Sequence, residues 1–284
     1  MSYLFAHFTG EENDGEQIYF SKSEDGLHFT DLNNGEPVLI SDIGETGVRD
    51  PFIVQNGKTG RYYLIATDLR IALGKGWNVA QYSGSRDMII WESDDLSNWE
   101  GPRAVTLAVP EAGCLWAPES VYIPTEDRFF VFWASMVPSG EEKKQIIYAA
   151  YTSDFISFTE PFKYMEAPNH MIDTTIVEDN GYFYRFVKDE THKCIMMDRV
   201  KTLVGSTPEP IHSDVLENFF GVEGPECYQL PDGKWCLIVD RFATGKGYVP
   251  LITDDLSSGD FRILDDSEFD FGTTKKRHGG VIRL

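Results

Sequence analysis

The sequence predicts an all-β protein, a five-bladed β-propeller closed by pairing of its N- and C-terminal strands. Three observations predict this fold. One plan of short strands and turns recurs five times along the chain. The fifth copy is divided between the two ends of the sequence, and the 3.6-residue periodicity of amphipathic helices is nearly absent. Four-stranded units that repeat around an axis and lock end to end are typical of a propeller.

Each repeat is expected to begin with a short apolar strand. These first strands cover residues 50–54, 117–123, 173–177, 224–230 and 278–284. Hairpin turn signals follow the first four, at residues 55–57, 124–127, 178–181 and 231–233. Aromatic-rich or apolar second strands come next, at residues 62–66, 129–133, 182–186 and 235–239. Three third strands end in near-copies of one motif, at residues 92–99, 151–158 and 252–261.

The divided copy explains how the ring closes. Residues 3–8 supply its second strand, residues 17–21 its third strand and residues 23–29 its turn, while residues 278–284 supply the missing first strand. The alternative fold is a β-sandwich, which has no reason to repeat one strand-turn-strand plan five times.

Composition narrows the class of protein. The chain has 284 residues, of which 42% are hydrophobic, and it lacks a low-complexity linker, so we expect one domain over residues 1–284. Its formal net charge of −21 disfavours nucleic acid and anionic membranes as partners and favours a neutral polar ligand. The sequence shows neither a signal peptide nor an apolar stretch that could span a bilayer. We expect a cytoplasmic protein, or a secreted one if an export signal has been trimmed away.

Polar residues at the starts of the five first strands are the candidate site. In a propeller the first strand of each blade lines the central channel, so these residues converge on one channel mouth. The converging residues are Asp50, Glu119 or its neighbour Trp116, Asp173, Glu223 and His278. Three carboxylates around a water-filled funnel repel one another. They make chemical sense if one is protonated, one acts as a base and one tunes the others.

Each residue also has a purely structural interpretation. Asp50 before Pro51 could simply start a strand, and Asp173 could cap the following turn. His278 could be a packed channel histidine, and Trp116 could belong to the core. Arg241 could reach a sugar hydroxyl or pair with a nearby acid such as Asp240.

Five short motifs, taken in order, resemble glycoside hydrolase family 43. They are Arg49-Asp50-Pro51, Trp116-Ala117-Pro118-Glu119, Ile172-Asp173-Thr174, Glu223-Gly224-Pro225 and Arg277-His278-Gly279. Members of that family are five-bladed propeller enzymes that act mostly on arabinan, arabinoxylan and xylan. The resemblance covers essentially the whole chain.

The resemblance implies a role for each position. Asp50 would be the general base, Glu223 the general acid, and Asp173 the residue that orients the acid and raises its pKa. His278 would lie where many family members hold a calcium ion or ordered water, with no other cofactor required. The expected substrate-binding residues are Trp116, Phe52, Glu119 and Arg241. An inverting reaction follows from this assignment, since residues on different blades can leave room for a water.

The predicted activity is exo-acting removal of α-L-arabinofuranosyl residues from arabinose- or xylose-containing oligosaccharides, with β-D-xylosidase activity as an addition or an alternative. Insertions at residues 69–85, 137–144 and 219–221 are expected to shape the pocket and favour chain ends. A propeller that binds carbohydrate without turnover is the alternative of a different class. The half-blade before Asp50 departs from the common family pattern and leaves the role of His7 open.

Overall fold

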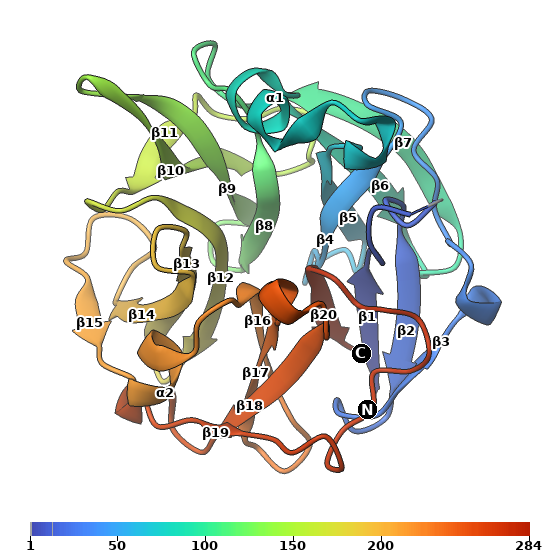
Figure 1. The fold of residues 1–284 in the computed structure, drawn as a ribbon, viewed down its shortest axis with the longest axis vertical. Coiled ribbons are helices and arrows are strands. Elements are labelled where there is room, and N and C mark those ends of the chain that lie inside the picture. The colour runs from blue at the N-terminus through green and yellow to red at the C-terminus, as the bar shows by residue number, and fades with distance from the viewer. Residues whose placement is uncertain (1, 13) are drawn as a thin grey trace.

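The computed structural model describes residues 2–12 and 14–284 and has five four-stranded antiparallel sheets arranged as blades around a central axis (Figure 1). The five-bladed propeller is therefore confirmed. The innermost strands contact one another around the channel. They are β4 (Val48–Gln55), β8 (Trp116–Ile123), β12 (Met171–Asp179), β16 (Glu223–Gln229) and β20 (Gly279–Arg283).

The remaining strands follow outward from the channel in every blade. The second strands are β5 (Tyr62–Asp68), β9 (Arg128–Ser139), β13 (Tyr182–Asp189), β17 (Trp235–Asp240) and β1 (Tyr3–His7). The third strands are β6 (Asp87–Ser93), β10 (Glu142–Thr152), β14 (Cys194–Val200), β18 (Tyr248–Thr253) and β2 (Tyr19–Ser23). The outer strands are β7 (Trp99–Thr106), β11 (Phe162–Met165), β15 (Glu209–Ile211), β19 (Arg262–Ile263) and β3 (Phe29–Asp31).

The two ends of the chain close the ring, as predicted. β1 pairs antiparallel with β20, in a register that runs from Tyr3 opposite Arg283 to His7 opposite Gly279. The expected third strand of this blade at residues 17–21 begins two residues later, at Tyr19. Gln17 instead uses its side chain to bind backbone, since its oxygen accepts from Ser41 N and its Nε2 donates to the carbonyl of Thr46.

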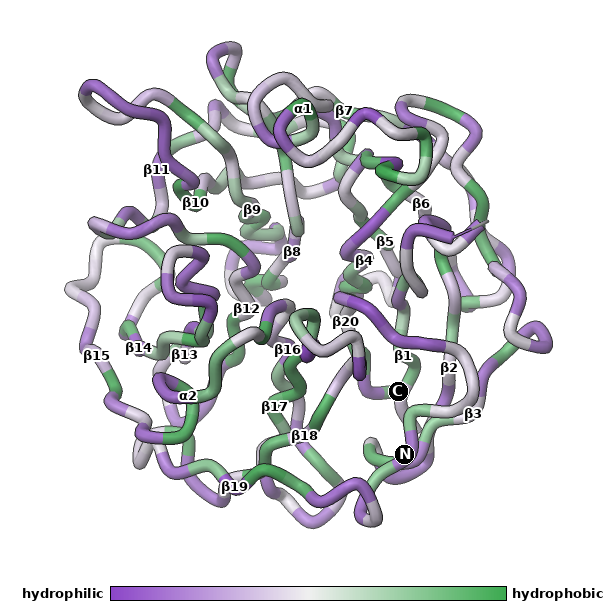
Figure 2. Tube along the Cα trace, in the orientation of Figure 1, coloured by the Kyte–Doolittle hydropathy of each residue, from purple (hydrophilic) through white to green (hydrophobic). Residues whose placement is uncertain are grey.

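Five apolar clusters fill the spaces between neighbouring blades. Alternation along β9 explains how one strand serves two of them, because successive side chains point to opposite faces of a sheet. Phe129 and Val131 pack toward β5 and β6, whereas Phe130 and Phe132 pack toward β12. Figure 2 shows the apolar colour running through strands such as β17 and β18, with hydrophilic segments in many connecting loops. The core therefore lies between the blades and leaves the channel mouth free for polar groups.

The repeated Ser/Thr-x-Asp motif forms the turn after the third strand. In the first blade, the hydroxyl of Ser93 accepts a hydrogen bond from Leu96 N, and the carboxylate of Asp95 accepts from Ser97 N and Asn98 N. Thr152 and Asp154 make the same bonds in the next blade. Such side-chain bonds satisfy backbone N–H groups that leave the ladder, which is why the motif recurs at equivalent places.

Helices are short and few among the described residues. α1 (Gly76–Ser83) lies in the segment between β5 and β6, and α2 (Asp214–Asn218) precedes β16. Short 3-10 turns are η1 (Asn33–Gly35), η2 (Ile71–Leu73), η3 (Phe242–Thr244) and η4 (Leu256–Ser258). None of the described helices is long and apolar enough to cross a membrane.

Candidate active site

The innermost strands of four blades begin with the same β-bulge. The pairing register shifts after Arg49 in β4, Trp116 in β8, Ile172 in β12 and Glu223 in β16. The next residue in each strand has a left-handed backbone, with φ of 51° at Asp50, 46° at Ala117, 50° at Asp173 and 54° at Gly224. Bulges of this kind re-aim side chains and are frequent beside active sites. Proline follows in three of the four, where the ladder does not need its missing N–H.

The bulges agree with the alignment of the repeated first strands, in which Asp50, Ala117, Asp173 and Gly224 are equivalent. Glu223 is equivalent to Arg49, Trp116 and Ile172, one residue before the bulge residue. The three carboxylates therefore reach the channel mouth from two different positions along the strands.

Position 224 requires a glycine, both for its backbone conformation and for the close approach of His278. Its φ is positive, and a Cβ added there would lie 2.6 Å from Cγ of His278. Gly224 also connects two blades, because its carbonyl accepts a bond from the hydroxyl of Tyr248, which in turn accepts from Gly279 N. This contact fixes the backbone beside Glu223 against the strand that follows His278.

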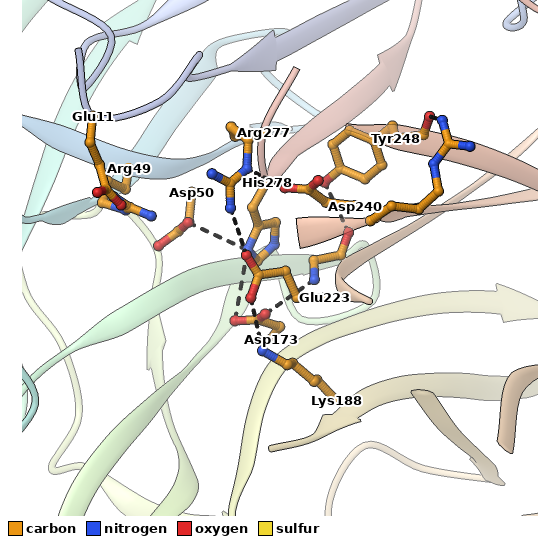
Figure 3. A network of polar contacts seen from close by, with 12 residues as sticks. Glu11, Arg49, Asp50, Asp173, Lys188, Glu223, Asp240, Tyr248, Arg277 and His278 are labelled. Atoms are coloured by element: carbon orange, nitrogen blue, oxygen red, sulfur yellow. Dashed lines mark hydrogen bonds and ion pairs between the residues drawn. The ribbon is translucent and has the colours of Figure 1, made fainter. Parts of the chain in front are cut away.

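A cavity of about 370 Å³ lies at this channel mouth. That volume is near the lower end of the range for small-molecule sites, roughly 300–1,000 Å³. The predicted residues Asp50, Asp173, Glu223, Trp116 and His278 all line it. They are joined there by Arg49, Trp77, Lys188, Phe242 and Arg277, among others. Figure 3 shows how the charged members lie around Glu223 and His278.

Asp50 is held by a hydrogen bond from the next strand. The hydroxyl of Thr67 donates to Asp50 Oδ2 at 2.8 Å and accepts from Ala117 N, also at 2.8 Å. The other carboxylate oxygen of Asp50 lies 3.5 Å from Nδ1 of His278. Asp50 is thus oriented by two blades while its carboxylate still faces the cavity.

Asp173 is more deeply buried than Asp50. Its Oδ2 accepts a hydrogen bond from Gly224 N at 3.1 Å, and its Oδ1 lies 3.7 Å from the same His278 nitrogen. Burial, together with the negative charges of Glu223 and Asp50, raises the pKa of Asp173 to about 6, although His278 and Lys188 act in the opposite direction. Asp50 and Asp173 therefore share one imidazole nitrogen.

Glu223 lies between two cations (Figure 3). Its Oε2 accepts from Lys188 Nζ at 2.8 Å, and its Oε1 accepts from Arg277 Nη2 at 2.9 Å. Burial alone would raise the pKa of Glu223, but the ammonium and guanidinium charges outweigh it and hold that pKa below its usual value. The sequence analysis expected Asp173 to raise the pKa of Glu223, whereas the net shift in the structure is downward.

Each of the two cations has a second carboxylate partner. Arg277 Nε donates to Asp240 Oδ2 at 2.5 Å, and Asp240 is fully buried. Lys188 Nζ lies 2.7 Å from Glu190 Oε2. The pKa of Lys188 is raised by Glu223, Asp173 and Glu190 even though burial opposes the charge. The site is therefore a connected network in which moving one charge affects several others.

Three predicted substrate-binding residues lie outside the cavity lining. Phe52 packs closely against Gly280 between β4 and β20. A Cβ added to Gly280 would lie only 2.8 Å from Cδ2 of Phe52. Arg241 donates to the carbonyls of Gly247 and Tyr248, with Asp266 3.7 Å away. Both side chains are thus engaged in structural contacts away from the cavity.

Glu119 lies deeper in the channel, where it forms a buried acidic pair with Glu226. Burial and the neighbouring Glu226 raise the pKa of Glu119 well above its usual value, while burial raises that of Glu226 to about 8. Glu226 accepts hydrogen bonds from Val281 N and from the hydroxyl of Thr175. The bulge explains the placement: Glu119 and Glu226 lie three residues beyond Trp116 and Glu223, but their partners on the next strand are only two residues apart, so they share the face of Trp116 and Glu223.

The whole chain matches a known family. The model of the family related to glycoside hydrolase family 43, described as a probable glycosyl hydrolase domain, matches residues 1–284. The chain belongs to this family. A curated α-L-arabinofuranosidase of Bifidobacterium longum subsp. longum is 31% identical over 288 residues, which cover 85% of this chain and 27% of that protein. The chain thus spans about a quarter of the length of that relative.

Solved structures of glycosidases share the fold. A β-1,3-galactosidase of family 43, bound to galactodeoxynojirimycin, superposes with a TM-score of 0.64 at 12% identity, covering 95% of this chain and 92% of that one. An endo-1,4-β-xylanase from Bacteroides thetaiotaomicron gives a TM-score of 0.62 at 13% identity, covering 93% and 90%. At these identities the likeness concerns the fold alone.

Calcium, which the family resemblance suggests, finds no ready set of side-chain ligands. Calcium takes roughly six to eight oxygen ligands. Among the described residues, no three His, Cys, Asp or Glu side chains are placed to share an ion. His278 turns its Nδ1 toward Asp50 and Asp173. The side chains therefore do not form a calcium site by themselves, and a metal role for His278 stays a prediction.

His7 does not line the cavity. Its ring is fully buried, with Nδ1 3.2 Å from the carbonyl oxygen of Phe8 and Nε2 3.1 Å from the hydroxyl of Ser21. Burial lowers the pKa of His7 to about 3. It is a neutral packed histidine that fixes the blade built from both chain ends.

Several lining residues were missed from the sequence. Arg49 and Arg277 stood beside predicted residues in the family motifs, and that adjacency was the available signal. Lys188 comes at the end of a second strand, where no motif marks it. Trp77 was expected only as part of the inserted segment at residues 69–85, and that segment does shape the cavity.

Proposed function

We propose that this protein is a glycosidase that removes terminal α-L-arabinofuranosyl residues from plant cell-wall oligosaccharides or polysaccharides, with inversion at the anomeric carbon. The observation that carries the proposal is the set of three carboxylates, Asp50, Asp173 and Glu223, around one small cavity. Carboxylate pairs on either side of a sugar are the groups that glycoside hydrolysis requires. The choice of arabinose rests on the 31% identical relative, a curated α-L-arabinofuranosidase.

In the proposed reaction, Asp50 acts as the base. Its carboxylate takes a proton from a water molecule whose oxygen attacks the anomeric carbon. The bond from that carbon to the leaving oxygen breaks, and Glu223 gives its proton to the leaving oxygen. An inverting enzyme needs a gap of roughly 6.5–9.5 Å between acid and base to hold the water. Asp173 positions Glu223 by accepting from Gly224 N, the next backbone N–H along the chain.

The ion pairs of Glu223 set a condition on this mechanism. Lys188 and Arg277 favour the ionised carboxylate, whereas a general acid must carry a proton. Glu223 would hold its proton more strongly if the bound sugar displaced Lys188 or Arg277, for which Glu190 and Asp240 are second partners. Asp173 is the alternative acid, because its pKa of about 6 is closer to neutrality.

The first test is release of nitrophenol from aryl α-L-arabinofuranoside and aryl β-D-xylopyranoside. Wild type is compared with Glu223→Ala, which should lose roughly 10²–10⁴-fold in rate, and less on a strongly activated leaving group. The preferred aryl glycoside identifies the sugar and distinguishes an α-L-arabinofuranosidase from the β-D-xylosidase alternative.

Time-resolved NMR of the first-formed anomer tests inversion, which a retained product would contradict. Saturable oligosaccharide binding without sugar release would favour the non-catalytic propeller.

A further inference from the structure

Trp77 is an exposed aromatic side chain at the rim of the cavity. It lies in α1, within the segment between β5 and β6, and it lines the same cavity as Asp50 and Glu223. Its side chain is large and apolar, yet the residue is 48% exposed. Ligand cavities are commonly lined by aromatic side chains, so an exposed indole at the rim of this one is placed to contact a bound ligand.

The segment that carries Trp77 is fixed at both ends. Ile71 N and Ala72 N donate to the two carboxylate oxygens of Glu16, both at 2.9 Å, and Glu16 is buried. Beyond the helix, Gly84 N donates to the carbonyl of Gly113 at 2.8 Å. Trp77 is therefore presented by an anchored element, which lowers the entropy lost when a ligand packs against it.

One face of the indole is already occupied. The guanidinium carbon of Arg49 lies 4.9 Å from the Trp77 ring centroid and 4.4 Å from that of Phe8, while Nη1 of Arg49 pairs with Glu16 at 3.0 Å. Trp116 meets Trp77 edge-on, with centroids 6.2 Å apart and an interplanar angle of 86°. Arg49 covers one face of the ring, so a ligand could stack only on the opposite face of Trp77.

The cavity has a buried floor and an exposed rim. Asp173 and His278 are buried at its floor, whereas Trp77 is exposed at its rim. A terminal sugar whose anomeric carbon lies among the carboxylates leaves the rest of the chain pointing toward the rim. The next sugar, on the leaving-group side of the cleaved bond, then reaches the level of Trp77.

We propose that Trp77 is a stacking platform for the sugar on the leaving-group side of the bond. This inference rests on the proposed function and names its substrate class, a terminal pentose attached to a further sugar ring. The C–H groups on one face of a sugar ring pack against the open face of the indole. Trp77 thereby selects oligosaccharides over glycosides whose leaving group is too small to reach the rim.

The test compares Trp77→Ala with Tyr82→Ala. Tyr82 lies on the same helix and is 40% exposed, but it does not line the cavity. Dissociation constants for an arabinose-terminated trisaccharide and for free arabinose are measured by calorimetry in an Asp50→Asn background, which stops turnover. Trp77→Ala should weaken trisaccharide binding about 10-fold, the effect of losing one aromatic stacking contact. It should leave arabinose binding within twofold, and Tyr82→Ala should change neither.

Kinetics supply a second readout in the active enzyme. Trp77→Ala should raise KM for the trisaccharide about 10-fold and raise KM for arabinofuranosyl fluoride much less, because fluoride is too small to reach Trp77. Trp77→Phe, which keeps an aromatic face, should restore most of the affinity. Equal weakening of trisaccharide and arabinose, or no change in either, would overturn the platform.

Failure of the inference can be told apart from failure of the proposed function. If the wild type releases no sugar but binds the trisaccharide, and Trp77→Ala weakens that binding, the proposed hydrolase activity is contradicted and the role of Trp77 is not. A wild-type enzyme that cleaves the trisaccharide equally well without Trp77 would overturn only the platform. A protein that binds no arabinose-terminated sugar would overturn both.

Discussion

The ammonium nitrogen of Lys188 lies 2.8 Å from Oε2 of Glu223, so a cation from the third blade is bound directly to the proposed acid of the fourth. Arg277 of the terminal segment binds the other oxygen of the same carboxylate. Two cations therefore bind the carboxylate that must deliver a proton in the proposed reaction, and both favour its ionised form. They make the protonation of Glu223 dependent on where Lys188 lies.

Removing the charge of Lys188 should move the pH profile. If Glu223 is the acid, activity falls as pH rises through its pKa, and Lys188 lowers that pKa. Lys188→Met should therefore shift the alkaline limb of kcat/KM to higher pH by about one unit or more. Lys193→Met is the matched control, because Lys193 pairs with Glu190 and should move the limb much less. An unmoved limb in Lys188→Met would show that another group carries the proton.

The acid can be identified by leaving-group dependence. A variant that lacks its general acid retains activity on glycosides with good leaving groups and loses it on poor ones. We expect Glu223→Gln to lose roughly 10²–10⁴-fold on an alkyl arabinofuranoside and much less on a dinitrophenyl one. Asp173→Asn should lose activity on both, because it disturbs position and not proton delivery. The reverse pattern would assign the acid to Asp173, whose pKa is about 6.

Thr67 should matter for both stability and rate. Its hydroxyl donates to Asp50 and accepts from the N–H of Ala117 in the next blade. Thr67→Val leaves that buried N–H without an acceptor, which should cost about 1–3 kcal/mol in urea unfolding. The rate should also fall, since Asp50 loses an orienting bond. Thr67→Ser keeps the hydroxyl and should retain the rate, and equal loss of rate in both variants would point to packing instead.

The buried acid Glu226 should make stability depend on pH. Its pKa is about 8 in the folded protein and near 4.3 when unfolded, so its contribution is full below the unfolded value and is lost as pH rises through about 8. Glu226→Gln should therefore raise the urea midpoint at pH 8.5, by a few kcal/mol in unfolding free energy, and flatten the decline from acid pH. Glu141→Gln, at an exposed site, is the control. Glu119, whose pKa burial also raises, should leave a residual decline, and an undiminished decline in Glu226→Gln would contradict the prediction.

The blade plan and the three carboxylates of the site could be predicted from the sequence alone. Five repeats and the split copy led to the propeller and its closure through β1 and β20. Asp50, Asp173, Glu223, Trp116 and His278 were predicted, and all line the cavity. These features could be predicted because strand order and turn chemistry are local, and a propeller brings the starts of its inner strands together.

The sequence did not predict which side chains face the cavity or which charged residues pair, because both depend on how the strands and blades pack together. Strand alternation has a period of two residues, and each bulge adds one residue that local sequence does not place. That is why Phe52 and Glu119 were expected at the cavity and lie elsewhere. Lys188 reaches Glu223 across 35 positions in the sequence, a pairing created only when two blades pack side by side.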